Sequence, residues 1–218
     1  MKKKSILMAA NLVWLTAVVF CGSLFAGPET SSKGKTMGLG LEAGYVMPAE
    51  DNFGKSPAFG LSFFYSLSKQ FRVELKGSFF PTGVENDPEG LSAGTLNVIP
   101  LQLSLQYRLK LSLRFIPYLG AGVGYYLNNF SLENSDQWQN LGFNINEEVD
   151  SAFGYHFGAG IDYFIKSNMA INIDVRYSIA SFNGSYTISE VVSGISHSGN
   201  IEGDINHISF GAGIKFLF

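Results

Sequence analysis

Residues 99–110 read Ile-Pro-Leu-Gln-Leu-Ser-Leu-Gln-Tyr-Arg-Leu-Lys, and this stretch decides the fold class. Its odd-numbered residues are all apolar, and its even-numbered residues are polar except for Pro100. A period of two places successive side chains on opposite faces of an extended chain. The stretch is therefore predicted to be a β-strand with one apolar face.

The same alternation occurs in seven other stretches, so the sequence predicts an all-β fold of eight antiparallel strands. The 25 glycines and the 14% aromatic content also favour strands and tight turns over helices. The seven other predicted strands are residues 39–47, 59–67, 71–79, 118–125, 153–165, 169–179 and 208–218.

The second face of these strands distinguishes a soluble barrel from a membrane barrel. Eight strands of large apolar side chains would overfill the interior of a small barrel. The opposite face is small or charged and fits inside, with glycine at positions 40, 44, 60, 120, 122, 124, 154, 158, 160, 211 and 213. Strands of about 10 residues, tilted by about 40°, also span the roughly 25 Å of an outer-membrane apolar band. We therefore expect an eight-stranded transmembrane β-barrel, with a soluble barrel as the alternative.

Composition excludes several other classes of protein. The chain has 218 residues, which suits a single domain. Only 15% of the residues are charged and the net charge is −3, which argues against a disordered chain and against a nucleic-acid partner. The single cysteine, Cys21, excludes a disulfide framework.

The first 26 residues have the layout of a cleaved signal peptide. Three lysines at positions 2–4 precede an apolar run over residues 6–20, and small residues follow up to Ala26. We expect cleavage after Ala26 and a barrel over residues 27–218, with a retained membrane anchor as the alternative.

The connections between the predicted strands alternate in length. Three are short, at residues 68–70, 110–114 and 166–168, and four are long, at residues 48–56, 81–95, 128–152 and 181–204. The long ones hold 13 of the 18 acidic residues. Because long loops of such barrels face outward, the sequence predicts four long acidic extracellular loops.

Three stretches resemble the OmpW family of small outer-membrane barrels: residues 99–107 (IPLQLSLQY), 115–125 (FIPYLGAGVGY) and 151–177. Gly213, Phe216 and Phe218 resemble the C-terminal signal that the barrel-assembly machinery reads. The resemblance implies location in the outer membrane of a Gram-negative cell. It also implies a narrow, partly apolar lumen that binds or passes small hydrophobic molecules, with no catalysis, no metal and no cofactor.

The inward face carries nine charged residues, four acidic and five basic. We expect them to form a buried ion-pair network that plugs the barrel. The alternative is a water-filled path lined by the same charges. The residues are Glu42, Arg72, Glu74, Lys76, Arg108, Asp162, Asp174, Arg176 and Lys215.

Five large aromatic residues interrupt the inward face, which is otherwise built from small residues. They are the candidate hydrophobic ligand site near one mouth of the barrel, and plain interior packing is the alternative. The residues are Phe64, Phe80, Tyr118, Tyr126 and Phe164.

Two other functions compete with the binding or passage of small hydrophobic molecules. One is a structural, receptor or adhesion barrel with a plugged lumen, whose loops carry the function. The remote one is an outer-membrane lipid hydrolase that uses His207 and Ser209, which lie two residues apart on one strand face. The expected partners are outer-membrane lipid and lipopolysaccharide, the barrel-assembly machinery and a small hydrophobic ligand.

Overall fold

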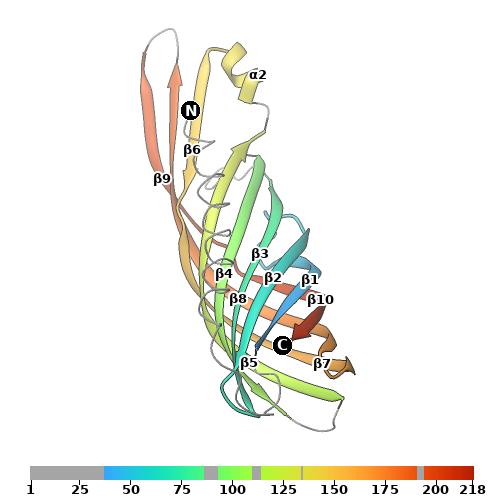
Figure 1. The fold of residues 1–218 in the computed structure, drawn as a ribbon. Coiled ribbons are helices and arrows are strands. Elements are labelled where there is room, and N and C mark those ends of the chain that lie inside the picture. Colours follow the sequence, from blue (N-terminus) through green and yellow to red (C-terminus); the bar gives the residue numbers. More distant parts are fainter. Residues whose placement is uncertain (1–36, 86–92, 110–113, 134, 191–193) are drawn as a thin grey trace. The chain divides into compact units, whose positions relative to one another are not determined.

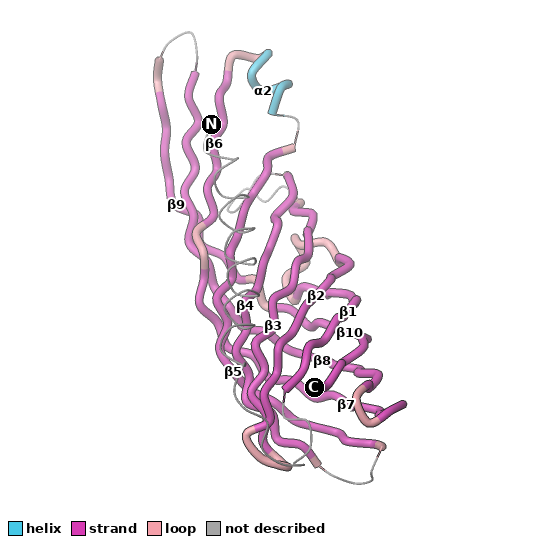
Figure 2. Tube along the Cα trace, viewed as in Figure 1, coloured by secondary structure: helices cyan, strands magenta, loops and turns pink. Residues whose placement is uncertain are grey.

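The computed structural model describes residues 37–85, 93–109, 114–133, 135–190 and 194–218, all of them within the unit of residues 35–218 (Figure 2). The predicted signal peptide, residues 1–26, lies outside the described residues. Figure 1 labels the strands and one short helix. Their bounds are β1 Met37–Pro48, β2 Ser56–Ser66, β3 Phe71–Val84, β4 Gly94–Arg108, β5 Phe115–Leu132, α2 Ser135–Asn140, β6 Phe143–Val149, β7 Ala152–Lys166, β8 Met169–Glu190, β9 Ser196–Asp204 and β10 His207–Leu217. No helix among the described residues is long and apolar enough to cross a membrane.

Eight of these strands form a closed antiparallel ring. Its order is β1-β2-β3-β4-β5-β7-β8-β10, and β10 pairs with β1 from Gly38↔Leu217 to Pro48↔His207. The eight-stranded antiparallel barrel predicted from the alternation is therefore confirmed.

The two ends of the barrel differ in their connections. At one end, which we call the turn end, β2 and β3 are joined by a tight turn in which the Ser68 hydroxyl accepts hydrogen bonds from the backbone N–H groups of Gln70 (3.2 Å) and Phe71 (3.0 Å). The other end, which we call the loop end, carries α2, β6 and β9 (Figure 1).

The outer surface of the ring is apolar, as the alternation predicts. Phe153 is 76% exposed and Ile173 is 55% exposed, yet both belong to the regular strands of the ring. Large apolar side chains on the outside of a closed barrel are stable where lipid replaces water.

Two of the four predicted long loops differ from the prediction. Residues 128–152 contain the end of β5 and all of β6, and residues 181–204 contain the end of β8 and all of β9. Strand β8 pairs with β10 only as far as Ser178 and then continues to Glu190 between β6 and β9. We call this three-stranded sheet of β6, β9 and residues 181–190 the extension. Its many Ser, Asn and Gly residues are typical of turns, which is why their alternation was not predicted to be strand.

The polarity of the strand faces inverts between the ring and the extension. Within the ring, the inward face of β8 is polar, with Asp174 buried, and the outward face is apolar, with Ile173 exposed. Further along, Phe182 is buried inside whereas Asn183 is exposed outside. The apolar outer surface of β8 therefore ends near residue 180, where we expect the strand to leave the membrane.

Candidate functional site in the barrel lumen

The half of the lumen nearer the turn end is filled by a charged layer. All nine inward charges predicted from the sequence take part in it. The ion pairs at the turn end converge on Asp162, whose carboxylate faces Arg72 Nη1 at 2.8 Å, Lys215 Nζ at 3.2 Å and Arg108 Nη2 at 3.7 Å. Residues 72, 162 and 215 are brought together because β3 lies across the lumen from β7 and β10, which flank β8.

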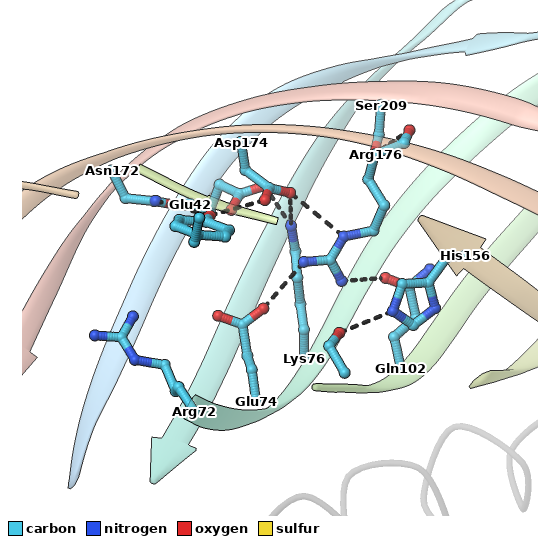
Figure 3. A network of polar contacts seen from close by, with 12 residues as sticks. Glu42, Arg72, Glu74, Lys76, Gln102, His156, Asn172, Asp174, Arg176 and Ser209 are labelled. Atoms are coloured by element: carbon cyan, nitrogen blue, oxygen red, sulfur yellow. Dashed lines mark hydrogen bonds and ion pairs between the residues drawn. The ribbon is translucent and has the colours of Figure 1, made fainter. Parts of the chain in front are cut away.

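The middle of the charged layer is built around Glu74 and Asp174 (Figure 3). Glu74 pairs with Arg176 Nη2 at 3.0 Å and with Lys215 Nζ at 3.5 Å. Asp174 pairs with Arg176 Nε at 3.4 Å and with Lys76 Nζ at 3.6 Å, and Lys76 also contacts Glu42. Most of these side chains are buried, so the network closes this part of the lumen instead of lining an open path.

Neutral polar side chains complete the layer. Of these only Tyr118 was among the predicted site residues, and it was assigned there to the hydrophobic ligand site. Gln102 accepts from Arg176 Nη1 (2.7 Å) and donates to Ser178 Oγ (3.2 Å). Tyr118 donates to Asp174 Oδ2 (2.9 Å) and accepts from Asn172 Nδ2 (3.0 Å). Their even-numbered positions on β4, β5 and β8 place them on the inward face, and this is the sequence signal that could have identified them. A polar group on that face needs a hydrogen-bond partner once it is buried.

Glycines on the inward face make room for these side chains. A Cβ atom at Gly160 would lie 2.3 Å from the Tyr118 hydroxyl and 2.6 Å from the Ile173 carbonyl oxygen. The phenol of Tyr118 can reach Asp174 only because position 160 has no side chain.

An apolar cluster fills the lumen above the charged layer, toward the loop end. Its centre consists of side chains that are almost fully shielded from solvent, including Leu96 and Val98 at 0% exposure. The cluster comprises Val46, Phe53, Phe80, Val84, Leu96, Val98, Tyr126, Phe130, Ala152, Ala180, Phe182, Ile201 and Ile205. The lumen therefore has two layers of opposite chemistry.

The five aromatic residues of the candidate ligand site are not brought together. The prediction of a single pocket near one mouth is therefore corrected. Phe80 and Tyr126 belong to the apolar cluster, where both rings pack edge-on against His207. Phe64 lies at the turn end, with its ring centroid 4.3 Å from Arg72 Cζ. Tyr118 and Phe164 are also nearer the turn end. Strand parity predicts which face a residue occupies, but not its height in the barrel.

A small cavity lies where the two layers meet. Its volume is about 20 Å³, enough for about one water molecule. It is lined by Glu42 and Lys76 from the charged layer, by Phe80 and His207 from above, and by Ala58 of β2.

The residues of the hydrolase alternative do not form a catalytic pair. His207 Nδ1 lies 2.7 Å from the carbonyl oxygen of Ile205, and Ser209 Oγ donates to the carbonyl oxygen of Arg176 at 3.4 Å. The Ser–His contact in the lumen is instead Ser104 Oγ with His156 Nε2 at 2.8 Å, and His156 Nδ1 has no hydrogen-bond partner to orient the ring. Over the described residues, no group of three or more His, Cys, Asp or Glu side chains is arranged to hold a metal ion.

Comparison with known proteins agrees with the barrel geometry. Residues 15–216 match the family model of the outer membrane protein beta-barrel domain. The chain belongs to this family. This outer-membrane barrel is also 28% identical over 120 residues to y4mB, an uncharacterised outer-membrane protein of Sinorhizobium fredii. The match covers 55% of this chain and 49% of that relative, so the chain spans about half of the relative's length.

Solved structures support the same fold. The crystal structure of OprG from Pseudomonas aeruginosa is similar with a TM-score of 0.64 at 18% identity, over 85% of this chain and 97% of that one. The solution structure of outer membrane protein W from E. coli is similar with a TM-score of 0.50 at 20% identity, over 86% of this chain and 100% of that one. The predicted resemblance to small OmpW-like barrels is confirmed at the level of the fold, and the chain is located in the outer membrane.

Proposed function

We propose that this barrel binds small hydrophobic molecules at its loop end and passes them into the outer membrane. The observation that carries the proposal is the apolar cluster inside the lumen. The interior of a membrane barrel is ordinarily polar, whereas the lumen of this one becomes apolar toward the loop end. Ligand pockets are lined mostly by such side chains with a few polar groups at one side, and the charged layer supplies these.

The inner face of the extension continues the apolar cluster beyond the ring. Residues of β8 at alternate positions share a face, so Tyr186 and Ile188 lie on the same side as the buried Phe182. Ile188 is paired with Ile145 of β6, and Tyr186 packs against the cluster. On the opposite face Asn183 and Ser185 are exposed, whereas Thr187 and Ser189 are half-buried. Glu147, the partner of Tyr186, and His197, the partner of Ile188, interrupt this inner face with polar groups. An apolar molecule arriving from outside therefore meets several apolar side chains along it.

The charged layer closes the direct path along the barrel axis, which favours an exit through the barrel wall. The β2–β3 ladder ends at Phe59↔Phe79, and the next backbone bond is from Gly54 N–H to the Gly83 carbonyl oxygen at 2.7 Å. Pro57 and Pro81 lie in this interval, and proline has no N–H with which to continue a ladder. The small cavity between the two layers adjoins the same interval through Ala58 and Phe80.

The test is methyl-labelled NMR of the refolded chain in lipid nanodiscs, titrated with toluene as the apolar probe. We expect saturable shifts of the inward Leu96 and Val98 methyls, whereas the lipid-facing Leu103 methyls change only in proportion to the toluene dissolved in lipid. The Phe80→Ser variant should weaken the saturable change. Phe64→Ser is the matched control, because Phe64 lies on the other side of the charged layer. Inward methyls that respond no more than those of Leu103 would overturn the proposal.

A receptor or adhesion barrel with a plugged lumen is the second candidate. It is favoured by the burial of the ion pairs and by the small volume of the cavity between the layers, about 20 Å³. Toluene shifts absent from Leu96 and Val98 in a correctly folded barrel would favour it, and would direct attention to the exposed surface of the extension.

A further inference from the structure

Among the described residues the charges of the lumen do not balance, and the excess lies at the turn end. The charged layer holds five basic and four acidic side chains. Arg72, Arg108 and Lys215 converge on the single carboxylate of Asp162, although Lys215 also reaches Glu74 at 3.5 Å. The two guanidinium groups approach the same oxygen, Oδ2, and Arg108 is the more distant at 3.7 Å. An uncompensated buried cation is costly, so this region favours a further negative charge.

Buried hydrogen-bond donors without partners gather around the same point. At this end of the lumen they are Nε and Nη2 of Arg72, Nε of Arg108 and Nε2 of Gln106, whose Oε1 also lacks a partner. Elsewhere in the described lumen, Arg176 Nε also lacks a hydrogen-bond partner. Arg72, Gln106 and Arg108 are 0%, 1% and 8% exposed, so their donors are largely shielded from bulk solvent. Buried polar groups normally have partners, and several orphan donors in one place are an exception that calls for a ligand.

The strand geometry brings these three side chains to one place. Arg72 and Gln106 are direct partners in the β3–β4 ladder, and Arg108 follows two residues later on the same inward face. The ring of Phe64 covers the guanidinium of Arg72 at 4.3 Å and helps to hold its orientation. The donors therefore lie on two neighbouring strands beside the turn end.

We propose that Arg72, Gln106 and Arg108 form a binding site for a small monovalent anion inside the turn end of the barrel. A single negative charge would neutralise the excess of one cation, and its lone pairs would accept from the orphan donors. A water molecule would satisfy the donors but would leave the excess charge. This site is separate from the apolar cluster and does not depend on the proposed passage of hydrophobic molecules.

The experiment uses chloride as the probe. The full mature barrel is refolded in detergent with ¹⁵N-labelled arginine, and the side-chain Nε–H resonances are followed while sodium chloride replaces sodium gluconate at constant ionic strength. We expect the resonances of Arg72 and Arg108 to shift and saturate with one common midpoint. Arg176 is the internal control. Its Nη atoms already donate to Gln102 and Glu74, and its Nε, which has no hydrogen-bond partner, lies 3.4 Å from Asp174 Oδ1, so its resonance should not follow that curve.

Two variants and a control separate the site from a general effect of salt. Arg108→Gln makes the charges of the layer equal and should weaken chloride binding by roughly tenfold or more, since it removes both a charge and a donor. Lys69→Gln removes one positive charge from the exposed β2–β3 turn and should leave the midpoint unchanged. Gln106→Leu keeps the charge and removes the amide, so it decides the matter if Arg108→Gln does not refold.

The proposal is wrong if the arginine resonances drift without saturating, or if Arg176 follows Arg72. It is also wrong if the Nε–H proton of Arg72 exchanges with water and its resonance does not change with the chloride concentration. Equal midpoints for the wild-type chain and the Gln106→Leu variant would exclude the assigned amide.

Discussion

Replacing Asp162 with Asn is the sharpest test of the charged layer. The substitution keeps the shape of the side chain and removes the only acidic partner of Arg72 and Arg108 among the described residues, whereas Lys215 keeps Glu74 at 3.5 Å. The excess of one positive charge becomes an excess of two in a part of the lumen where the Asp162 side chain is 1% exposed. Breaking a buried ion pair from one side costs about 3–5 kcal/mol.

This cost is large compared with the stability of an ordinary domain, about 5–15 kcal/mol. With a urea dependence of about 2 kcal/mol per molar, the unfolding midpoint of the Asp162→Asn barrel should fall by about 2 M. The measurement is urea unfolding of the refolded barrel in micelles, with the folded fraction read from its heat-dependent mobility on a gel.

The double variant Asp162→Asn/Arg72→Met serves as the control for this prediction. The second substitution removes Arg72, the cation that makes the shortest contact with Asp162. Because neither member of this ion pair is then left alone, part of the lost stability should return. A midpoint within about 0.5 M of the wild-type value for Asp162→Asn would refute the view that these ion pairs hold the lumen closed.

Three further predictions follow from the same structure. Gly160→Ala should cost about 1–3 kcal/mol in urea unfolding, because the added methyl meets Tyr118 and the Ile173 carbonyl, whereas Gly83→Ala, with nothing within 4 Å of its Cβ, should cost close to nothing. Leu103→Arg, on the lipid-facing side of β4, should lower the free energy of unfolding by about 2–4 kcal/mol. Thr95→Arg, on the same strand face but beyond the apolar band, should lower it by no more than about 1 kcal/mol. Equal losses of stability would contradict the assigned membrane boundary. The correctly folded barrel should be silent in single-channel recordings in a planar bilayer, and stable ion-conducting openings would show that the charged layer is not closed.

Much of the barrel could be predicted from local alternation. The pattern of residues 99–110 recurs in every strand of the ring, and the parity of each residue fixes the face it occupies because successive side chains of a strand point in opposite directions. For this reason the nine inward charges could be named in advance. The extension was missed, because its Ser, Asn and Gly residues are also typical of loops.

The sequence by itself determined the eight strands of the ring, their closed antiparallel architecture and which of their side chains face the lumen. Only the tertiary structure decided which of those side chains meet. Arg72 and Asp162 are far apart in the chain and lie 2.8 Å apart across the barrel, while Phe64 and Phe80 share a face and are divided by the charged layer. Parity is a property of one strand, whereas height and opposition in the lumen depend on the register of all eight strands and on their closure.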